Sequence, residues 1–244
     1  MLNEQTCNEI AALRLYGMLQ GFKDRLARPD HAELSHGEFT GLIVQDEKVH
    51  RENQRLKRLL KDAKLRVQVA LEDVNHKHPR GLNKQVLLDL GSPQWIIQHK
   101  NVLLTGPTGI GKTFLACALG NMAARAGLTV LYLHAPRLFE FLLQARGQGT
   151  HLKALAKIAK VQLLILDDFL LTPPADAERK ELLEIIEDRY GAGSTIITSQ
   201  CPLDQWHEHI GDPTLADAIL DRLFHNAFKI PLKGASFRSG RDSK

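Results

Sequence analysis

The pattern of apolar and polar positions divides the chain into a helical first part and an alternating second part. Apolar side chains recur at helical spacing through residues 1–75, and the longest amphipathic stretch runs from about residue 41 to 74. Pro79 and Gly81 then interrupt the pattern, which indicates a linker. We predict a helical N-terminal domain at 1–75, a linker and lead-in at 76–100, and a second domain at 101–244.

Five short apolar runs in the second domain predict β-strands. These runs are 101–105, 129–134, 161–167, 194–199 and 227–232, with helical segments beginning at Lys112, Pro136, Ala175 and Thr214. The runs are apolar throughout instead of alternating, which is typical of parallel strands covered on both faces. The second domain is therefore predicted to be a three-layer αβα fold around a parallel five-stranded sheet.

A glycine-rich segment follows the first predicted strand and precedes a predicted helix. Residues 106–113 match the phosphate-loop pattern G-x-x-x-x-G-K-[ST] at every fixed position. Glycines allow main-chain N–H groups to surround phosphate oxygens, and the start of a helix adds positive potential. We expect the following residues to contact ATP: Gly106, Pro107, Thr108, Gly109, Ile110, Gly111, Lys112, Thr113 and Phe114. Lys112 is expected to reach the β- and γ-phosphates.

Two acids end the third predicted strand, as in a Walker B motif. Asp167 and Asp168 follow the apolar residues 163–166. Asp167 is expected to bind Mg²⁺ together with the Thr113 hydroxyl, and Asp168 to activate the attacking water. For Asp168, capping of a following helix is the alternative.

The fourth predicted strand ends in polar residues beside Pro202. Ser199 or Gln200 would lie near the γ-phosphate if this strand neighbours the Walker B strand. A turn-forming role before Pro202 is the alternative.

A basic segment lies in the predicted N-terminal helices. Residues 48–66 hold eight Lys or Arg and two acids, a local net charge of +6 against +4 for the whole chain. Val49, Leu56, Leu60, Ala63 and Val67 form one apolar stripe on a helical wheel, away from most of the cations. The predicted contacts with DNA phosphates are Lys48, Arg51, Arg55, Lys57, Arg58, Lys61 and Lys64. A solvated charged helix and a membrane-surface helix remain alternatives, although the stripe has no aromatic anchor.

Composition favours a folded cytoplasmic protein. Charged residues make up 25% of the chain, and no apolar run approaches the roughly 20 residues that span a bilayer. The N-terminus lacks the pattern of a signal peptide, so we expect a cytoplasmic location and no membrane partner. Three widely separated cysteines make a disulfide framework improbable.

Several segments together resemble the IstB family of ATP-binding proteins, which are encoded by bacterial insertion sequences. They are GPTGIGKTFLACALG, LLILDD, ERKELLEIIEDRY, STIITSQ and ADAILDRLFHNA, followed by a closing G-x-S-x-R. The resemblance covers about residues 5–240. It implies an AAA+ ATPase related to DnaC and DnaA, which uses ATP and Mg²⁺ and forms homo-oligomers with the ATP site at the subunit interface.

The resemblance also implies partners and further site residues. The partners are double-stranded target DNA and an IstA-type transposase, which such helpers recruit and stimulate. Arg222 falls at the position of an arginine finger and Arg238 at that of the sensor-II arginine. An ion pair of Arg222 with Asp217 or Asp221 is the alternative.

The sequence departs from the family pattern at two places beside Asp167. Asp168 stands where most AAA+ proteins have Glu, which predicts slow hydrolysis, and Leu170 stands where relatives usually have Gly. Little sequence follows Arg238, so the helical lid is expected to be minimal or absent.

Two other functions compete with a transposition helper. A DnaC-like replicative helicase loader would use the same ATPase with a different partner. A small-molecule kinase has the same phosphate loop. However, this sequence has no obvious arginine-rich lid, and a kinase would leave Arg222 without a role.

Overall fold

In the computed structural model, the chain separates into two units, residues 1–58 and 59–244. The structure describes residues 2–27, 34–75, 81–234 and 236. The predicted linker residues 76–80 lie outside these ranges. Among the described residues, no helix is both long and apolar enough to cross a membrane.

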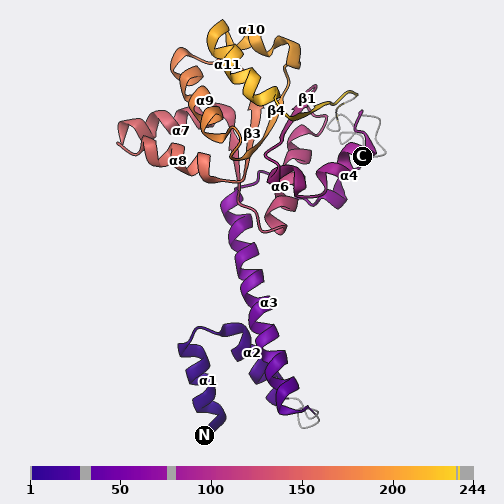
Figure 1. The fold of residues 1–244 in the computed structure, drawn as a ribbon, viewed down its shortest axis with the longest axis vertical. Coiled ribbons are helices and arrows are strands. Elements are labelled where there is room, and N and C mark those ends of the chain that lie inside the picture. The colour runs from indigo at the N-terminus through magenta and orange to yellow at the C-terminus, as the bar shows by residue number, and fades with distance from the viewer. Residues whose placement is uncertain (1, 28–33, 76–80, 235, 237–244) are drawn as a thin grey trace, which may run out of the picture. The chain divides into compact units, whose positions relative to one another are not determined.

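The first unit is helical, as the sequence predicts. It contains α1 (Leu2–Ala12), α2 (Tyr16–Leu26) and most of α3 (His36–Ala63) (Figure 1). Helix α2 packs closely on α3 through two glycines, because a Cβ atom at Gly17 would collide with His50 and one at Gly21 with Asp46. The absence of side chains at these two positions sets how closely the two helices approach.

Glu47 of α3 caps the start of α2. Leu15, at the N-cap position, gives no side-chain bond, but Glu47 Oε2 accepts from the main-chain N–H groups of Gly17 (2.8 Å) and Met18 (3.1 Å). Glu47 Oε1 accepts from Arg51 Nε at 2.6 Å. Burial raises the pKa of Glu47, but the bonds from Arg51 and the two amides outweigh it, so the pKa lies below its ordinary value.

The amphipathic helix ends earlier than its sequence pattern predicts. Helix α3 stops at Ala63, and Lys64 takes a left-handed conformation with φ of 51°. The chain then turns so that Leu65 and Val69 enter the core of the second unit. Residues 59–75 therefore belong to the second unit, whereas the predicted N-terminal domain ran to residue 75.

The predicted apolar stripe is also wrong at one position. Val67 lies beyond the end of α3, on the irregular segment that leads to a short 3₁₀ helix, η2 (Leu71–Asp73). A helix end at which Lys64, instead of glycine, takes the left-handed conformation has no sequence signal, which explains the error.

The second unit contains the predicted parallel five-stranded sheet. Its strands follow the order β2-β3-β4-β1-β5, and each predicted strand is confirmed to within two residues at either end. The strands are β1 (Asn101–Thr105), β2 (Val130–His134), β3 (Leu163–Phe169), β4 (Ser194–Ser199) and β5 (Ala227–Pro231).

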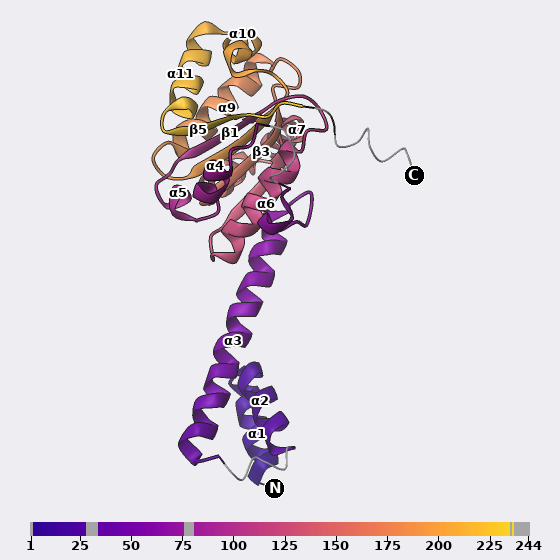
Figure 2. The same ribbon diagram turned by 90° about the vertical axis from the view of Figure 1, so that its right-hand side faces the viewer.

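Helices cover both faces of this sheet, which confirms the three-layer fold (Figures 1 and 2). Successive residues of a strand face opposite cores: Val102 and Leu104 pack with α6, while Leu103 packs with the helices of the other face. One face carries α4 (Lys84–Leu90), α5 (Gln94–Ile97) and α6 (Lys112–Arg125). The other carries α7 (Ala135–Gly147), α8 (His151–Lys160), α9 (Asp176–Arg189), η3 (Leu203–Gln205), α10 (Trp206–Ile210) and α11 (Pro213–Phe224).

The predicted helix starts at Lys112, Pro136, Ala175 and Thr214 agree with α6, α7, α9 and α11 to within one residue. Because all five strands are parallel, their carboxyl ends meet at one edge of the sheet. The glycine-rich loop follows β1 there, and Asp167 lies near the end of β3 opposite His134 of β2. This edge therefore gathers the residues that the sequence analysis singled out in separate motifs.

Candidate nucleotide-binding site

The glycine-rich loop turns from β1 into α6 through conformations that favour glycine. Gly106 has φ of 144°, and a Cβ atom there would collide with the carbonyl oxygen of Leu232. Gly111 has φ of 93° and lies at the N-cap of α6. The loop thus brings the start of a 14-residue helix to the edge of the sheet, where its free N–H groups favour an anion.

Lys112 lies inside this loop. Only 6% of the residue is exposed, and its Nζ donates to the carbonyl oxygens of Gly106 (2.6 Å) and Pro107 (3.0 Å). Burial lowers the pKa of Lys112, while the charges of Asp168 and Asp167 oppose this shift. The ammonium group is therefore held at the mouth of the loop by its main chain.

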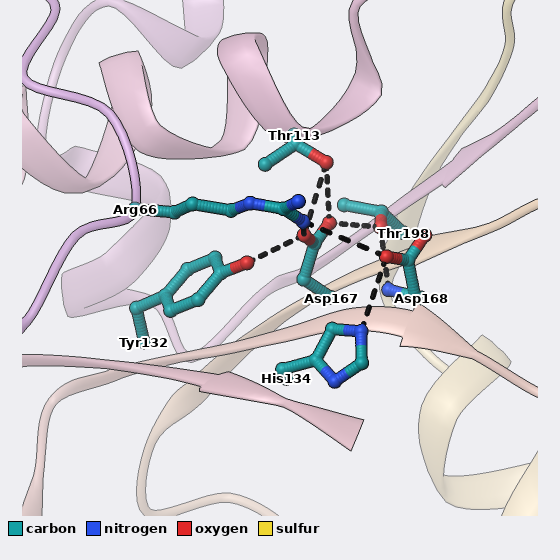
Figure 3. Close-up of polar contacts among 7 residues, drawn as sticks. All are labelled: Arg66, Thr113, Tyr132, His134, Asp167, Asp168 and Thr198. Carbon is teal, nitrogen blue, oxygen red and sulfur yellow. Dashed lines mark hydrogen bonds and ion pairs between the residues drawn. The ribbon is translucent and has the colours of Figure 1, made fainter. Parts of the chain in front are cut away.

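Asp167 is fully buried and accepts hydrogen bonds from several elements (Figure 3). Thr113 Oγ1, at the start of α6, lies 2.8 Å from Oδ1 and 3.0 Å from Oδ2 of this carboxylate. Thr198 of β4 donates to Oδ1 at 2.5 Å, and Tyr132 of β2 donates to Oδ2 at 2.5 Å. Arg66 Nη1 lies 3.4 Å from Oδ2. These donors offset the cost of burying a charged carboxylate.

Tyr132 is held in its protonated form by this arrangement. Burial of the phenol is the main cause that raises its pKa, and the hydrogen bond to Asp167 adds to the shift. The hydroxyl group therefore remains a donor to Asp167 at neutral pH.

Asp168 does not cap a following helix, so that alternative is wrong. The next helix, α9, has Ala175 at its N-cap. Asp168 Oδ2 instead lies 3.3 Å from His134 Nε2 and 3.7 Å from Arg66 Nη1. Figure 3 draws the two partners beside this carboxylate. Its main-chain N–H donates to Thr198 Oγ1 at 3.1 Å. Asp168 has φ of 57°, an uncommon conformation for a residue with a side chain.

Leu170 takes the left-handed conformation that a glycine would favour. Its φ is 54°, and the residue is 8% exposed within the core between the sheet and α9. The loop conformation is therefore kept here by packing of the leucine side chain.

The glycine-rich loop and Asp168 line one pocket of 460 Å³, a size within the usual range of ligand sites. Its lining residues are Arg66, Val67, Thr108, Gly109, Gly111, Lys112, Thr113, Phe114, Asp168 and Gln200. Of the other predicted contacts, Ile110 is fully buried in the core, while Gly106 and Pro107 contribute the carbonyl groups that bind Lys112.

Ser199 and Gln200 differ in their surroundings. The Ser199 hydroxyl donates to the carbonyl of Phe169 (2.7 Å) and accepts from the N–H of Cys201 (3.1 Å), which fixes the turn after β4. Gln200 is exposed and lines the pocket. Of the two residues, Gln200 is thus the one that lines the pocket.

The oxygen donors of this pocket fit Mg²⁺. Among the described residues, no three His, Cys, Asp or Glu side chains cluster as a metal site. Mg²⁺ does not need such a cluster, because it is usually bound by one or two carboxylates, substrate phosphates and water. The neighbouring Thr113 hydroxyl and Asp167 carboxylate supply oxygen atoms of that kind.

The remaining predicted site residues lie elsewhere. Arg222, near the end of α11, donates to Ala218 O (2.7 Å) and to Glu187 Oε1 of α9 (2.8 Å), so its partner is neither Asp217 nor Asp221. Arg238 lies outside the described residues. The predicted DNA contacts Lys48, Arg51, Arg55, Lys57, Arg58, Lys61 and Lys64 are all exposed.

Four residues around the acids were missed by the sequence analysis: Arg66, Tyr132, His134 and Thr198. Tyr132 and His134 carried a signal, since they are polar and lie at the end of the strand predicted to precede β3. Thr198 lies one residue before the polar pair that was considered. Arg66 carried no signal, because it was counted with the cations of a helix that ends at Ala63.

Curated relatives of this chain are ATP-binding proteins of insertion sequences. The chain is 45% identical to an insertion sequence ATP-binding protein of Sinorhizobium fredii, over 100% of both chains. It is 44% identical to the ATP-binding protein of insertion sequence IS1162 from Pseudomonas fluorescens, over 83% of this chain and 88% of that protein.

Solved structures of AAA+ proteins share the fold. The crystal structure of DnaI matches with a TM-score of 0.58 and 23% identity, over 74% of this chain and 92% of that chain. AMPPCP-bound DnaA from Aquifex aeolicus matches with a TM-score of 0.58 and 20% identity, over 70% of this chain and 51% of that chain.

The match to a protein family covers almost the whole chain. Residues 8–244 match the family described as IstB-like ATP binding protein. This match and the full-length relatives confirm the resemblance that the sequence motifs indicated. The chain belongs to the IstB-like family of insertion sequence ATP-binding proteins.

Proposed function

We propose that this chain is an ATPase that assembles on target DNA and recruits and stimulates a transposase during insertion-sequence transposition. The observation that carries the proposal is the pairing of Thr113 with the buried Asp167 at the glycine-rich loop. It occurs in a chain that is 45% identical throughout to an insertion sequence ATP-binding protein.

The loop residues bind and orient ATP in this proposal. Main-chain N–H groups of 106–113 surround the phosphates, and Lys112 turns from the carbonyls of Gly106 and Pro107 to the β- and γ-phosphates. Thr113 and Asp167 hold Mg²⁺, which neutralises phosphate charge when it is bound.

Asp168 orients the attacking water and accepts its proton. Its carboxylate lines the pocket and is held by His134 at 3.3 Å. Since Asp is one methylene shorter than the Glu of most AAA+ proteins, we expect slow hydrolysis that DNA or the transposase stimulates.

Arg222 acts on the pocket of a neighbouring copy. Asn101 Nδ2, at the first residue of β1, donates to the main-chain carbonyls of Arg222 and Leu223, whereas the glycine-rich loop follows the last residue of β1. Four steps along a strand separate these ends by about 13 Å. Arg222 is thus far from the loop of its own chain, which supports an ATP site completed by a second copy.

The exposed cations from Lys48 to Lys64 bind DNA phosphates. Positive side chains in a row release counterions on binding and give affinity without sequence preference. Arg51 is already paired with Glu47, so its contribution is expected to be smaller than that of its neighbours.

A replicative helicase loader is the alternative function. The solved structure of the DnaC helicase loader has this fold, with a TM-score of 0.51 and 19% identity, but at that identity the likeness concerns the fold alone. The relatives named for insertion sequences are more than twice as similar, which favours transposition.

The test is ATP-dependent assembly on duplex DNA. Size-exclusion chromatography and negative-stain electron microscopy would compare the full chain with a non-hydrolysable ATP analogue, with DNA, and with both. We expect oligomers only when the analogue and Mg²⁺ are present, and their stabilisation by DNA. A monomer under every condition would contradict the proposal.

Addition of the purified transposase then separates the two functions. The complex of ATP, DNA and this protein is expected to retain the transposase and raise its strand-transfer rate. Retention of a replicative helicase in place of the transposase would favour the loader.

A further inference from the structure

Arg66 belongs to the nucleotide pocket, although it follows the basic helix. It lies three residues beyond the end of α3, between the buried anchors Leu65 and Val69. Its guanidinium points toward both acids, with Nη1 at 3.4 Å from Asp167 and 3.7 Å from Asp168 (Figure 3). The anchors fix the main chain, so the side chain reaches the pocket without a change in the fold.

The acids create an electrostatic problem for a nucleotide. Asp167 and Asp168 bring two negative charges to a pocket proposed to bind a triphosphate, and Asp167 has no exposure to solvent that would screen it. Lys112 is bonded to the loop carbonyls, while Arg66 contacts both carboxylates directly. Arg66 therefore lowers the repulsion that ATP meets before a metal ion neutralises the site.

The same contact opposes the metal ion. Arg66 approaches Oδ2 of Asp167, the oxygen that also accepts from Tyr132, and Thr113 bonds both oxygens of this carboxylate. Thr113 and Asp167 are the pair proposed to hold Mg²⁺. A guanidinium and a divalent cation favour the same carboxylate oxygens, so each weakens the contact of the other.

We propose that Arg66 is a nucleotide-site residue whose positive charge partly replaces that of the metal ion. It promotes binding of metal-free ATP and competes with Mg²⁺ for Asp167. This inference rests on the ATP site of the proposed function. It makes the ATP affinity of the protein less dependent on Mg²⁺ than the two acids alone would allow.

Removal of the charge of Arg66 shifts two measured quantities in opposite senses. The Arg66→Gln variant is expected to bind ATP in EDTA at least about fivefold more weakly, because less positive charge then offsets the repulsion between the two carboxylates and the phosphates. The same variant needs less Mg²⁺ for half-maximal ATP binding, by about threefold or more, because a competitor for Asp167 is gone. If Arg66 had a purely structural role, the substitution would instead weaken ATP binding equally in EDTA and in Mg²⁺.

The experiment is equilibrium binding of a fluorescent ATP analogue to the full chain, first in EDTA and then with increasing Mg²⁺. Arg66→Lys, which keeps the charge, is expected to retain most of the affinity in EDTA. Arg125→Gln is the matched control, because Arg125 is an exposed arginine at the far end of α6 whose ion pair is with Glu72. It should match the unsubstituted chain in both measurements.

The outcomes separate this inference from the proposed function. If the unsubstituted chain binds no ATP analogue in Mg²⁺, the proposed ATP site itself fails. If that chain binds but Arg66→Gln has unchanged constants, or loses affinity equally with and without Mg²⁺, the inference about Arg66 is overturned. Thermal unfolding of each variant verifies that the compared proteins are folded.

Discussion

The side-chain amide of Asn101 donates to the main-chain carbonyl of Arg222 at 3.4 Å, at the amino end of β1. The glycine-rich loop lies at the carboxyl end of the same strand. The guanidinium of Arg222 is bonded to Glu187, and the two carbonyls that accept from Asn101 fix the end of α11. Arg222 is therefore anchored at the edge of the sheet opposite the glycine-rich loop, so its proposed role in catalysis can be tested separately from ATP binding.

Arg222→Ala is predicted to bind ATP normally and to hydrolyse it roughly 10³-fold more slowly under assembly conditions, the scale of an arginine supplied in trans. Binding of labelled ATP and single-turnover hydrolysis would measure the two effects. Glu187→Gln is the matched control, because it removes the ion pair and keeps the arginine. Equal losses of hydrolysis in both variants would indicate that only the ion pair matters.

Neutralising the basic residues of α3 is predicted to lower the affinity for DNA and to make that affinity less dependent on the salt concentration. Each cation removed from a DNA phosphate lowers the slope of log affinity against log salt by about 0.9. The double variant Lys57→Gln and Lys61→Gln should therefore reduce the slope by nearly two. Fluorescence anisotropy with duplex DNA at several salt concentrations measures it.

Lys153→Gln is the control for that series, since Lys153 is an exposed cation on α8 outside the basic segment. The control should keep the slope of the unsubstituted chain. An unchanged slope in the double variant would instead show that these two lysines are merely solvated.

At position 170, a glycine variant is predicted to be more stable than an alanine variant, which is the reverse of the usual order of stability. Leu170→Ala removes the buried side chain at a cost of about 2–5 kcal/mol in the free energy of unfolding. Leu170→Gly removes the same packing, but relief of the left-handed φ of 54° returns roughly 1 kcal/mol. The glycine variant should thus be the more stable of the two in urea unfolding. A less stable glycine variant would show that the conformation of Leu170 is not strained.

Glu47 is predicted to make the first unit sensitive to acid. Because its pKa is lowered on folding, its contribution to stability is present above pH 4.5 and is lost as the pH falls through the folded-state pKa. Glu47→Gln is expected to lower amide-exchange protection of Gly17 and Met18 by roughly 10- to 150-fold, the scale of about 1.5–3 kcal/mol for bonds to a charged group. Exchange measured by NMR at neutral pH would test this. Unchanged protection would mean that other contacts hold the start of α2.

The sheet and the phosphate loop could be predicted because their signals are local. Buried parallel strands such as β3 are mostly apolar, and residues Gly106 to Thr113 match the fixed spacing of the phosphate-loop pattern. Asp167 lies beside Thr113, as the paired motifs indicate.

The surroundings of the acids could not be predicted in the same way. Arg66 reaches Asp167 across 101 positions of sequence, after a turn that begins at Lys64 instead of a glycine. A helical pattern that continues past the true end of α3 counted this arginine among the cations of the basic segment. Such a helix end is determined by the burial of the residues that follow it, here Leu65 and Val69. The helix propensity of the local sequence does not determine it.

Binding of Mg·ATP tests the central claim most directly. Isothermal titration calorimetry of the full chain should give saturable heat with one nucleotide per chain. Lys112→Ala should remove most of that heat, because it removes the buried ammonium that is proposed to bind the phosphates. The absence of saturable heat from the folded, unsubstituted chain, or equal affinity in Lys112→Ala, would contradict the assignment of residues 106–113 as the ATP site.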